Sequence, residues 1–276
     1  MTTFGERLRD AVEQRGPLCA GIDPHAALLA DWGLDDSVGG LERFTMTAVE
    51  ALAGTVAVLK PQSAFFERHG SAGIAVLERA VRAARDQGAL VLLDVKRGDI
   101  GSTAQGYADA YLDQSSPLAV DAITASPFLG FGSLAPMLDT AETHGAGVFV
   151  LALTSNPEGP QFQHARTDDG RTVAGVVLDS LAERNSRTDG PGSFGAVVGA
   201  TIGGTEERLD IGGPLLVPGI GAQGGTADSV RDVFGEAVRH VLPSSSREIL
   251  RAGPDVEALR AAAARANDSF RALVAS

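Results

Sequence analysis

The sequence has 276 residues, of which 44% are hydrophobic, and its 23 basic and 35 acidic side chains give a net charge of −12. This balance argues against nonspecific binding to nucleic acid or to an anionic membrane, because both require a basic surface. No apolar stretch approaches the roughly 20 residues that span a bilayer, the charged first residues lack the apolar segment of a signal peptide, and the single cysteine, Cys19, excludes an intrachain disulfide. We therefore expect a cytoplasmic protein with no nucleic-acid or membrane partner.

Eight short apolar runs, of the kind expected for strands that are buried on both faces, recur along the chain. They are residues 18–23, 56–60, 90–96, 120–126, 148–154, 195–201, 214–219 and 240–245. Helix-compatible segments separate them, among them 40–54, 71–88 and 226–237, and the segment 255–274 closes the series. Eight strand–helix units predict an α/β fold, a (β/α)8 TIM barrel that forms a single domain over residues 1–276.

The distance between strand ends is nearly even at first and then changes. It lengthens after Thr154, which we interpret as a polar loop insertion near residues 155–171. It shortens after Thr201, where there is room only for a brief helix over residues 205–210.

An open Rossmann-type sheet is the competing architecture, because residues 219–224 match the GxGxxG pattern of dinucleotide-binding loops. The match occurs only in the seventh unit, and the next strand ends in serines rather than in an acidic residue for a ribose. In a barrel, the loops after strands seven and eight form the usual phosphate site. The glycine-rich loop 218–225 and Arg247 after the eighth strand therefore predict phosphate binding, with Gln223 able to bridge the phosphate and the rest of a ligand.

Only two of the basic residues are lysines, Lys60 and Lys96, and both lie at the predicted carboxyl ends of strands. Barrel enzymes carry their chemistry at these ends. An arginine cannot readily lose its proton, whereas a lysine ammonium can deliver one. This placement favours a functional role for both lysines over the alternative that they are ordinary surface residues.

The segment around Lys96 carries two carboxylates, Asp94 and Asp99. Residues two apart on a strand point to the same face, so Asp94 and Lys96 project together, and Asp99 follows close enough to join them. Adjacent negative charge holds a lysine as the ammonium, which suits a proton donor or an electrostatic stabiliser better than a Schiff-base nucleophile. The alternative is a buried ion pair that braces the barrel, but two carboxylates around one cation leave an unbalanced charge.

At these residues the sequence closely resembles the orotidine 5′-phosphate decarboxylases in their longer bacterial (type 2) form. The resemblance runs through nearly the whole chain, in segments such as LKPQSAFFERHG, LLDVKRGDIGSTAQGYADAYL, ITASPFLGFGSL, VPGIGAQGG and SSSREIL. The DxKxxD pattern alone is shared with related sugar-phosphate barrels, whereas its combination with the other segments is specific. The resemblance implies a homodimeric barrel that converts orotidine 5′-phosphate to UMP and carbon dioxide without a metal or an organic cofactor.

The resemblance also implies a role for individual residues. Lys96 would donate a proton to C6 of the pyrimidine, and Asp94 would hold Lys96 beside the departing carboxylate. The other expected site residues are Asp23 and Lys60 at the ribose hydroxyls, Ser126 at the pyrimidine amide, Pro218 and Gly219 lining the loop, Gln223 and Arg247 at the phosphate, and Asp99, Ile100 and Thr103, which would reach the partner subunit's site. Glu248, beside Arg247, departs from the small neutral residue expected there and would weaken phosphate binding if it pointed inward.

Two alternatives remain open at this point. One is a metal-dependent keto-sugar-phosphate decarboxylase or synthase of a related barrel family. The other is a nucleotide-binding barrel without catalytic activity.

Overall fold

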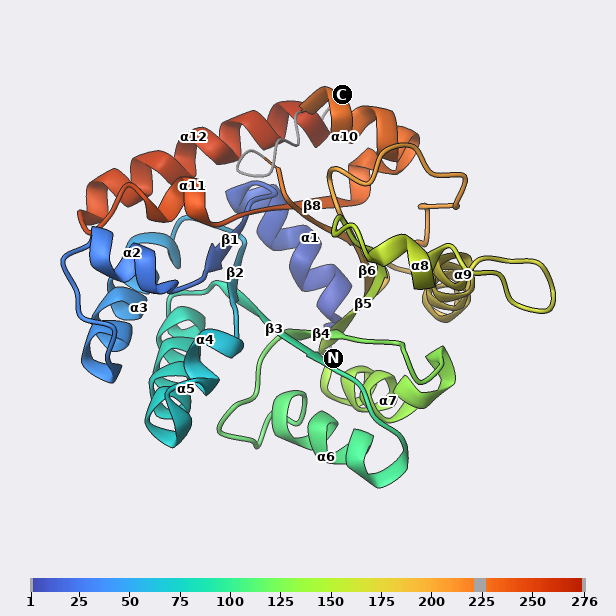
Figure 1. Cartoon of the computed structure of the whole chain (residues 1–276), viewed down its shortest axis with the longest axis horizontal. Helices are drawn as coiled ribbons and strands as arrows, with labels where there is room; N and C mark the ends of the chain where they lie inside the picture. Colours follow the sequence, from blue (N-terminus) through green and yellow to red (C-terminus); the bar gives the residue numbers. More distant parts are fainter. Residues whose placement is uncertain (1, 221–226, 275–276) are drawn as a thin grey trace.

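A computed structural model describes residues 2–220 and 227–274 of the chain (Figure 1). Eight parallel strands form a closed barrel in which each strand pairs with the next and β8 pairs with β1. The strands are β1 (Cys19–Ile22), β2 (Val58–Pro61), β3 (Leu90–Arg97), β4 (Ala122–Ala125), β5 (Gly147–Leu153), β6 (Phe194–Val198), β7 (Leu215–Pro218) and β8 (Val241–Ser245). Each of the eight apolar runs overlaps one of these strands. The predicted (β/α)8 barrel is therefore confirmed, and the Rossmann alternative is wrong.

Helices surround the barrel, because every strand except β6 is followed by at least one helix, whose apolar face packs on the sheet. In α5, for example, the buried side chains Val76, Leu77, Ala80 and Ala84 recur at the spacing of a helix face that packs on the sheet. The helices after β1 are α2 (Ala26–Asp31), α3 (Val38–Leu52), α4 (Ala64–Glu67), α5 (Gly70–Asp86), α6 (Gly101–Tyr111), α7 (Ala135–His144), α8 (Gly159–Gln163), α9 (Val173–Asn185), α10 (Ala227–Phe234), α11 (Arg247–Leu250) and α12 (Val256–Val274), with 3-10 helices η1 (Phe131–Leu134) and η2 (Gly235–His240).

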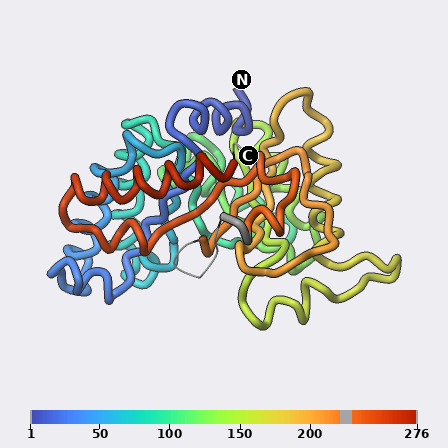
Figure 2. Tube along the Cα trace, turned by 90° about the horizontal axis from the view of Figure 1, so that it is seen from above, coloured from blue at the N-terminus to red at the C-terminus, as the bar shows by residue number. Residues whose placement is uncertain are grey.

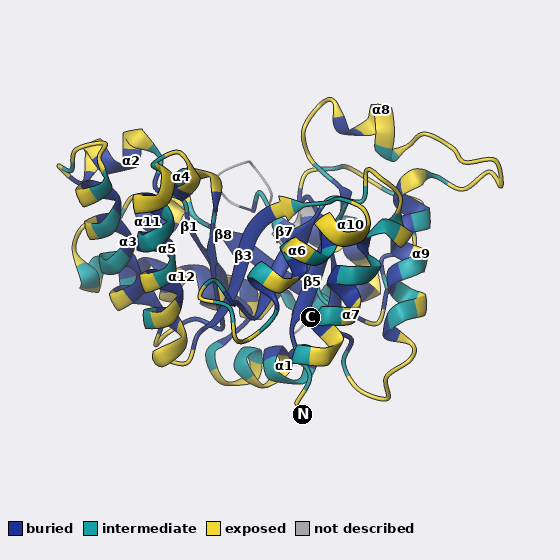
Figure 3. Cartoon of the chain, turned by 90° about the horizontal axis from the view of Figure 1, so that it is seen from below, coloured by how far each residue is buried: buried dark blue, intermediate teal, exposed yellow. Residues whose placement is uncertain are grey.

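A first helix, α1 (Phe4–Arg15), precedes the barrel and closes its amino end. Figure 3 shows α1 at the end of the molecule opposite to α2, α4 and α8, which follow the carboxyl ends of strands. Thr3 and Glu6 form a capping box at its start. Phe4 is buried and packs edge-to-face on Phe149 of β5, with 6.0 Å between ring centroids. Phe4 thus anchors α1 on the barrel at its amino end, and in barrels of this type ligands bind at the opposite, carboxyl end.

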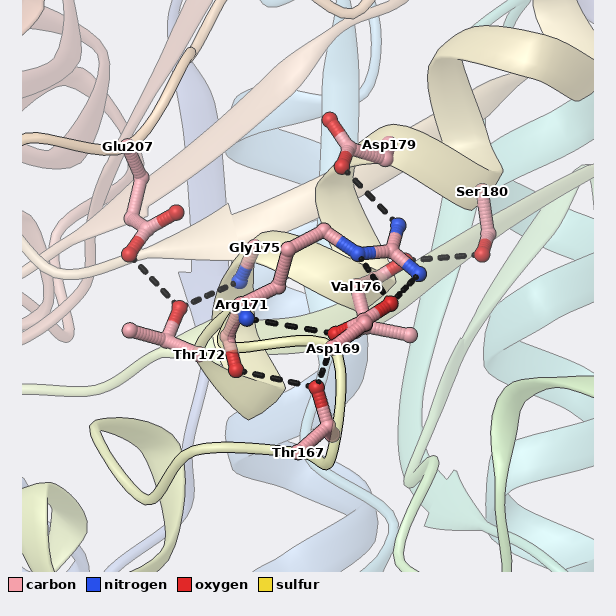
Figure 4. A network of polar contacts seen from close by, with 9 residues as sticks. All are labelled: Thr167, Asp169, Arg171, Thr172, Gly175, Val176, Asp179, Ser180 and Glu207. Carbon is pink, nitrogen blue, oxygen red and sulfur yellow. Dashed lines mark hydrogen bonds and ion pairs between the residues drawn. The ribbon is translucent and has the colours of Figure 1, made fainter.

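The predicted insertion after β5 is not a plain loop. It contains α8 and a tight turn that a bridge between Arg166 and Thr172 closes, and Figure 2 shows it extending away from the barrel. Polar contacts fasten the turn at its base (Figure 4): Thr172 Oγ1 accepts a hydrogen bond from the Gly175 N–H of α9 and donates one to Glu207 Oε1 at 2.6 Å. The base of the insertion is therefore tied both to α9 and to the segment between β6 and β7.

The brief helix predicted over residues 205–210 does not form. Residues 199–214, all of which the structure describes, contain no helix. Glycine pairs at 203–204 and 212–213 flank the segment and disfavour helical backbone. Within it, the Glu207 side chain is engaged by Thr172. A tertiary contact therefore replaces the local structure that this polar segment suggested.

Candidate active site

Both lysines of the sequence meet one carboxylate at the carboxyl ends of β2 and β3. Lys60 Nζ lies 3.2 Å from Asp94 Oδ2, and Lys96 Nζ lies 2.6 Å from Asp94 Oδ1. Lys60 and Asp94 are buried, whereas 46% of the Lys96 side chain is exposed. The arrangement fixes one ammonium inside the barrel and leaves a second ammonium that a ligand can reach.

The charges of this group stabilise one another. Burial disfavours the ionised form of Asp94, but the two ammonium groups and hydrogen bonds from Lys96 and Thr124 outweigh it and lower the pKa of the carboxyl. Burial likewise opposes the charged form of Lys60, but the carboxylates of Asp23 and Asp94 outweigh it and raise the pKa of the ammonium. Lys60 and Asp94 therefore both carry their charge at neutral pH.

The backbone at Lys96 departs from regular strand geometry. The pairing of β3 with β4 shifts register between Leu93 and Arg97, which marks a β-bulge. Within it, Lys96 has φ +46°, in the left-handed region that residues other than glycine rarely adopt. The prediction that Asp94 and Lys96 meet is confirmed. They meet through a distorted strand, and not through the regular alternation on which the prediction relied.

Thr124 is a residue of the site that the sequence prediction missed. It is buried in β4, where its Oγ1 donates a hydrogen bond to Asp94 Oδ1 at 2.8 Å and accepts one from the Lys96 N–H at 2.9 Å. The only signal in the sequence is a hydroxyl side chain inside an otherwise apolar strand run. That signal does not show which neighbour the hydroxyl contacts.

The ends of β1 and β8 each contribute a buried oxygen atom that lacks a hydrogen-bond partner among the described residues. Asp23 Oδ1 is buried and has no hydrogen-bond partner among the described residues, and the same holds for Ser246 Oγ at the end of β8. A Cβ at Gly21 would come within 2.7 Å of the Ser246 Cβ and 3.3 Å of Asp23 Oδ2, so both side chains lie against β1. Unpaired buried oxygens are rare. A ligand that carries hydroxyl groups would satisfy them.

Among the described residues, no hydrogen bond or ion pair joins the side chains of Asp99, Ile100 and Thr103 to the Lys60–Asp94–Lys96 group. Asp99 Oδ1 accepts a hydrogen bond from the Ile100 N–H at 2.8 Å, and among the described residues no ion pair joins it to Lys96. Ile100 is 62% exposed, and Thr103 is exposed in the first turn of α6. The expectation that Asp99 joins Asp94 and Lys96 within its own chain is therefore wrong. Its carboxylate turns instead to the backbone that begins α6.

Ser126, Pro218 and Gly219 lie at the ends of their strands, as expected. Ser126 directly follows β4, is partly exposed, and donates its backbone N–H to the carbonyl of Arg97 at 2.8 Å. Pro218 ends β7, and Gly219 has φ +95°, a conformation open to glycine. The glycine lets the chain turn sharply where the predicted phosphate loop begins.

Arg247 begins α11, two residues after the end of β8, and is exposed. Its neighbour Glu248 is also exposed and accepts a long hydrogen bond, 3.5 Å, from Ser245 Oγ at the end of β8. The Glu248 carboxylate therefore turns toward the strand end. Gln223, the other residue expected at the phosphate, lies outside the described residues.

Comparison with known proteins agrees with this geometry. The sequence profile of the orotidine 5′-phosphate decarboxylase / HUMPS family matches residues 16–262. The chain belongs to this family. It is 64% identical over 274 residues to the orotidine 5′-phosphate decarboxylase of a Nocardioides species, covering 98% of this chain and 100% of that protein. It is 60% identical over 266 residues to the corresponding Streptomyces coelicolor protein, covering 96% of each.

Solved structures place the fold in the same family. The crystal structure of a Streptomyces avermitilis protein assigned as an orotidine 5′-phosphate decarboxylase superposes with a TM-score of 0.98 at 60% identity, covering 100% of this chain and 97% of that one. The Leishmania donovani OMP decarboxylase superposes with a TM-score of 0.73 at 29% identity, covering 100% of both chains. The decarboxylase-family barrel is thus shared over the full length of the chain.

Within residues 2–220 and 227–274, no group of three or more His, Cys, Asp and Glu side chains is arranged to hold a metal ion. In the same part of the chain, no helix has the length and hydropathy that a membrane span requires.

Proposed function

We propose that this protein decarboxylates orotidine 5′-phosphate to UMP and carbon dioxide, the last step of de novo synthesis of pyrimidine nucleotides. The observation that carries the proposal is the Lys60–Asp94–Lys96 group at the carboxyl ends of the strands of this barrel. The relatives that share the whole chain carry the name of the same activity. A charged group of this kind suits a reaction that builds up negative charge on one carbon atom.

Lys96 is the proton donor of the proposed reaction. When the bond between C6 and the carboxylate breaks, its electron pair stays on C6, and carbon dioxide leaves. The pyrimidine ring cannot delocalise this carbanion well, so a preorganised ammonium beside it provides the stabilisation. A proton then passes from Lys96 Nζ to C6 to complete UMP, and the amine regains a proton from water. Lys96 suits this step because its Nζ is held by Asp94 while nearly half of its side chain stays accessible.

Asp94 and Lys60 keep the proton donor charged and in place. Asp94 is ionised, and it would lie beside the departing carboxylate, where it orients Lys96. Lys60 is buried and balances the charge of Asp94 from the neighbouring strand. With Asp23, whose buried Oδ1 lacks a partner among the described residues, Lys60 would bind the ribose hydroxyls.

The remaining expected contacts follow the strand ends. Ser126 would hydrogen-bond the pyrimidine amide, and Pro218 with Gly219 would line the loop above it. Gln223 and Arg247 would hold the phosphate. Because the exposed guanidinium of Arg247 makes no hydrogen bond or ion pair to the described residues, it is available for a bidentate contact with a phosphate.

The quaternary structure is part of the proposal. In a homodimer, the partly exposed Asp99 and the exposed Ile100 and Thr103 would reach the partner subunit's active site. This would account for an isoleucine that is 62% exposed beside a carboxylate that, among the described residues, makes no ion pair with Lys96 of its own chain. The enzyme would work in the cytoplasm, without a metal or an organic cofactor, as a single barrel domain from which residues 155–171 extend.

The test is to follow the ultraviolet absorbance of orotidine 5′-phosphate with purified protein in the presence of EDTA, and to identify UMP by chromatography. Prompt conversion establishes the decarboxylase and excludes the metal-dependent alternative. Conversion that EDTA abolishes and added metal restores would favour that alternative. Tight binding of UMP without any conversion would overturn the proposal in favour of a nucleotide-binding barrel without activity.

A further inference from the structure

Thr124 contacts both the Asp94 side chain and the Lys96 backbone in the Lys60–Asp94–Lys96 group. Its side chain lies inside the barrel wall, 1% of the residue is exposed, and its single hydroxyl makes two hydrogen bonds. The direction of both bonds is fixed, because the backbone N–H of Lys96 can only donate and the ionised Asp94 carboxylate can only accept. The hydroxyl hydrogen therefore points at Asp94 Oδ1, and an oxygen lone pair faces the Lys96 amide.

The β-bulge explains why a side chain takes this place. The ladder between β3 and β4 joins Leu93 to Ile123 and next Arg97 to Ala125, so three residues of β3 stand opposite Thr124 alone. The Thr124 hydroxyl binds the Lys96 N–H where a backbone carbonyl would serve in a regular ladder. A positive φ at a residue other than glycine persists only where its surroundings hold it. The contact from Thr124 is such a restraint.

The same hydroxyl acts on the carboxylate. Asp94 Oδ1 receives Lys96 Nζ at 2.6 Å and Thr124 Oγ1 at 2.8 Å, while Oδ2 receives Lys60 Nζ at 3.2 Å. The charged groups that face this site come from three strands: Lys60 from β2, Asp94 and Lys96 from β3, and Asp23 from the end of β1. The buried Cys19 thiol also faces them and is uncharged, because burial raises its pKa. Thr124 carries no charge either, so its hydroxyl restrains the Asp94 carboxylate without changing the balance of charge.

We propose that Thr124 is a positioning residue for the decarboxylation, whose hydroxyl holds both the Asp94 carboxylate and the Lys96 backbone in the geometry for proton transfer. The inference rests on the proposed function. It adds a residue on β4 that acts through Asp94 and Lys96 and need not touch the substrate. Replacing the hydroxyl with a methyl group would leave the Lys96 N–H and one acceptor position of Asp94 unpaired.

The experiment compares Thr124→Val, which removes the hydroxyl at nearly constant shape, with Thr124→Ser, which keeps it. Thr124→Val is expected to lower kcat by about 10- to 100-fold, the range for a lost hydrogen bond to a charged group, while KM changes less than about threefold. Because the charged form of Asp94 loses one hydrogen bond, the acid limb of the pH profile of kcat/KM shifts to higher pH. Thr124→Ser is expected to keep kcat within about threefold of the wild type.

Thr45→Val is the matched control. It makes the same chemical change at a buried threonine of α3, whose Oγ1 has no hydrogen-bond partner among the described residues. This control is expected to leave kcat and the pH profile unchanged. Thermal unfolding followed by circular dichroism shows whether each variant is folded under the assay conditions.

Several results would overturn the inference. One is a Thr124→Val enzyme with kcat within about threefold of the wild type. Another is a Thr124→Ser enzyme as slow as Thr124→Val, and a third is an acid limb that does not move, since each of these reveals packing alone. If the wild type itself makes no UMP, the proposed function fails, and Thr124 is judged by NMR titration of the Asp94 carboxyl. A titration that is the same in wild type and Thr124→Val would then overturn the contact, and one that moves to higher pH in the variant would support it.

Discussion

The two ends of the barrel each bury a carboxylate beside two cations, and they use different cations. At the carboxyl end, Asp94 meets Lys60 and Lys96. At the amino end, Asp121 lies just before β4, with Arg7 Nη1 at 2.5 Å and Arg85 Nε at 3.6 Å. Both carboxylates are almost completely buried. A buried carboxylate is therefore neutralised by two cations at each end of the barrel: by lysines at the carboxyl end and by arginines at the amino end, beside α1.

The chemistry of the two side chains explains the division. The planar guanidinium of Arg7 spans two partners at once, Asp121 and the Gly145 carbonyl at 2.9 Å, and so ties α1 to the barrel. Asp121 also accepts the Val91 N–H at 2.9 Å, so both of its oxygens are paired inside the chain. At the other end, Asp23 Oδ1 has no partner among the described residues, and the Lys96 backbone is strained. At the amino end, both carboxylate oxygens of Asp121 are satisfied within the chain. At the carboxyl end, the Asp23 Oδ1 that lacks a partner can accept a hydrogen bond from a ligand.

The largest effect is expected from the proton donor. Lys96→Arg keeps a positive charge but cannot deliver a proton, and Lys96→Ala removes both. Each is expected to lose at least about 10²- to 10⁴-fold in kcat, the usual range for general acid catalysis. Both should still bind UMP, measured by isothermal titration calorimetry. A variant that keeps a tenth or more of wild-type turnover, as an order of magnitude, would contradict the role of Lys96.

Removing the buried carboxylate of the amino end should affect stability and leave catalysis intact. Asp121→Ala leaves Arg7, Arg85 and the Val91 N–H without their shared acceptor. It is expected to lower the free energy of unfolding by about 3 kcal/mol, at the low end for a broken buried pair because about a third of the Arg7 side chain is exposed. Urea denaturation measures the loss. A fall in kcat of the folded variant without a loss of stability would break the comparison between the two ends.

Arg247 tests whether an arginine at the carboxyl end serves a ligand. Removing its charge-assisted contact with the phosphate by Arg247→Ala is expected to raise KM by about 10- to 100-fold, with a smaller change in kcat. The neighbouring Glu248→Gln is the control for charge, and it should lower KM slightly because a carboxylate near the phosphate is lost. An Arg247→Ala enzyme with unchanged KM would remove Arg247 from the phosphate site.

A smaller effect is expected when the arginine of the amino end is replaced with lysine. Arg7→Lys keeps the charge but cannot contact Asp121 and the Gly145 carbonyl together. The expected cost is about 1 kcal/mol of unfolding free energy, the value of one hydrogen bond, with kcat unchanged. If Arg7→Lys were as destabilising as Asp121→Ala, the geometry of the guanidinium would matter more than its charge.

The smallest effect on stability at neutral pH is expected from the ionisation of the buried Cys19 thiol. Burial raises the pKa of its thiol to about 12, although the ammonium of Lys60 opposes this. A folded pKa above the unfolded value contributes stability that is fully present below about pH 8.5, the unfolded pKa. That contribution is lost as the pH rises from there toward the folded pKa. A thiol reagent at pH 8 should therefore react far more slowly with the native protein than with the urea-unfolded chain; equal rates would show that Cys19 is accessible.

The sequence by itself determined the barrel and the location of its chemistry. Eight apolar runs are local signals for buried strands, and each of them overlaps a strand of the structure. The two lysines could be placed at one end of the barrel because the carboxyl ends of parallel strands all meet there. Periodicity, composition and motif spacing carry this information within short stretches of chain, which is why it can be read without the structure.

Only the tertiary structure decided how these residues meet. The bulge in β3, the positive φ of Lys96 and the position of Thr124 depend on the register between β3 and β4, which neither strand specifies alone. The same holds for Asp99, whose carboxylate turns to the start of α6, and for residues 205–210, where a contact from Thr172 replaces a helix. The contacts of a polar side chain depend on which acceptors and donors other segments bring within about 3 Å, a distance that spacing along the chain does not fix.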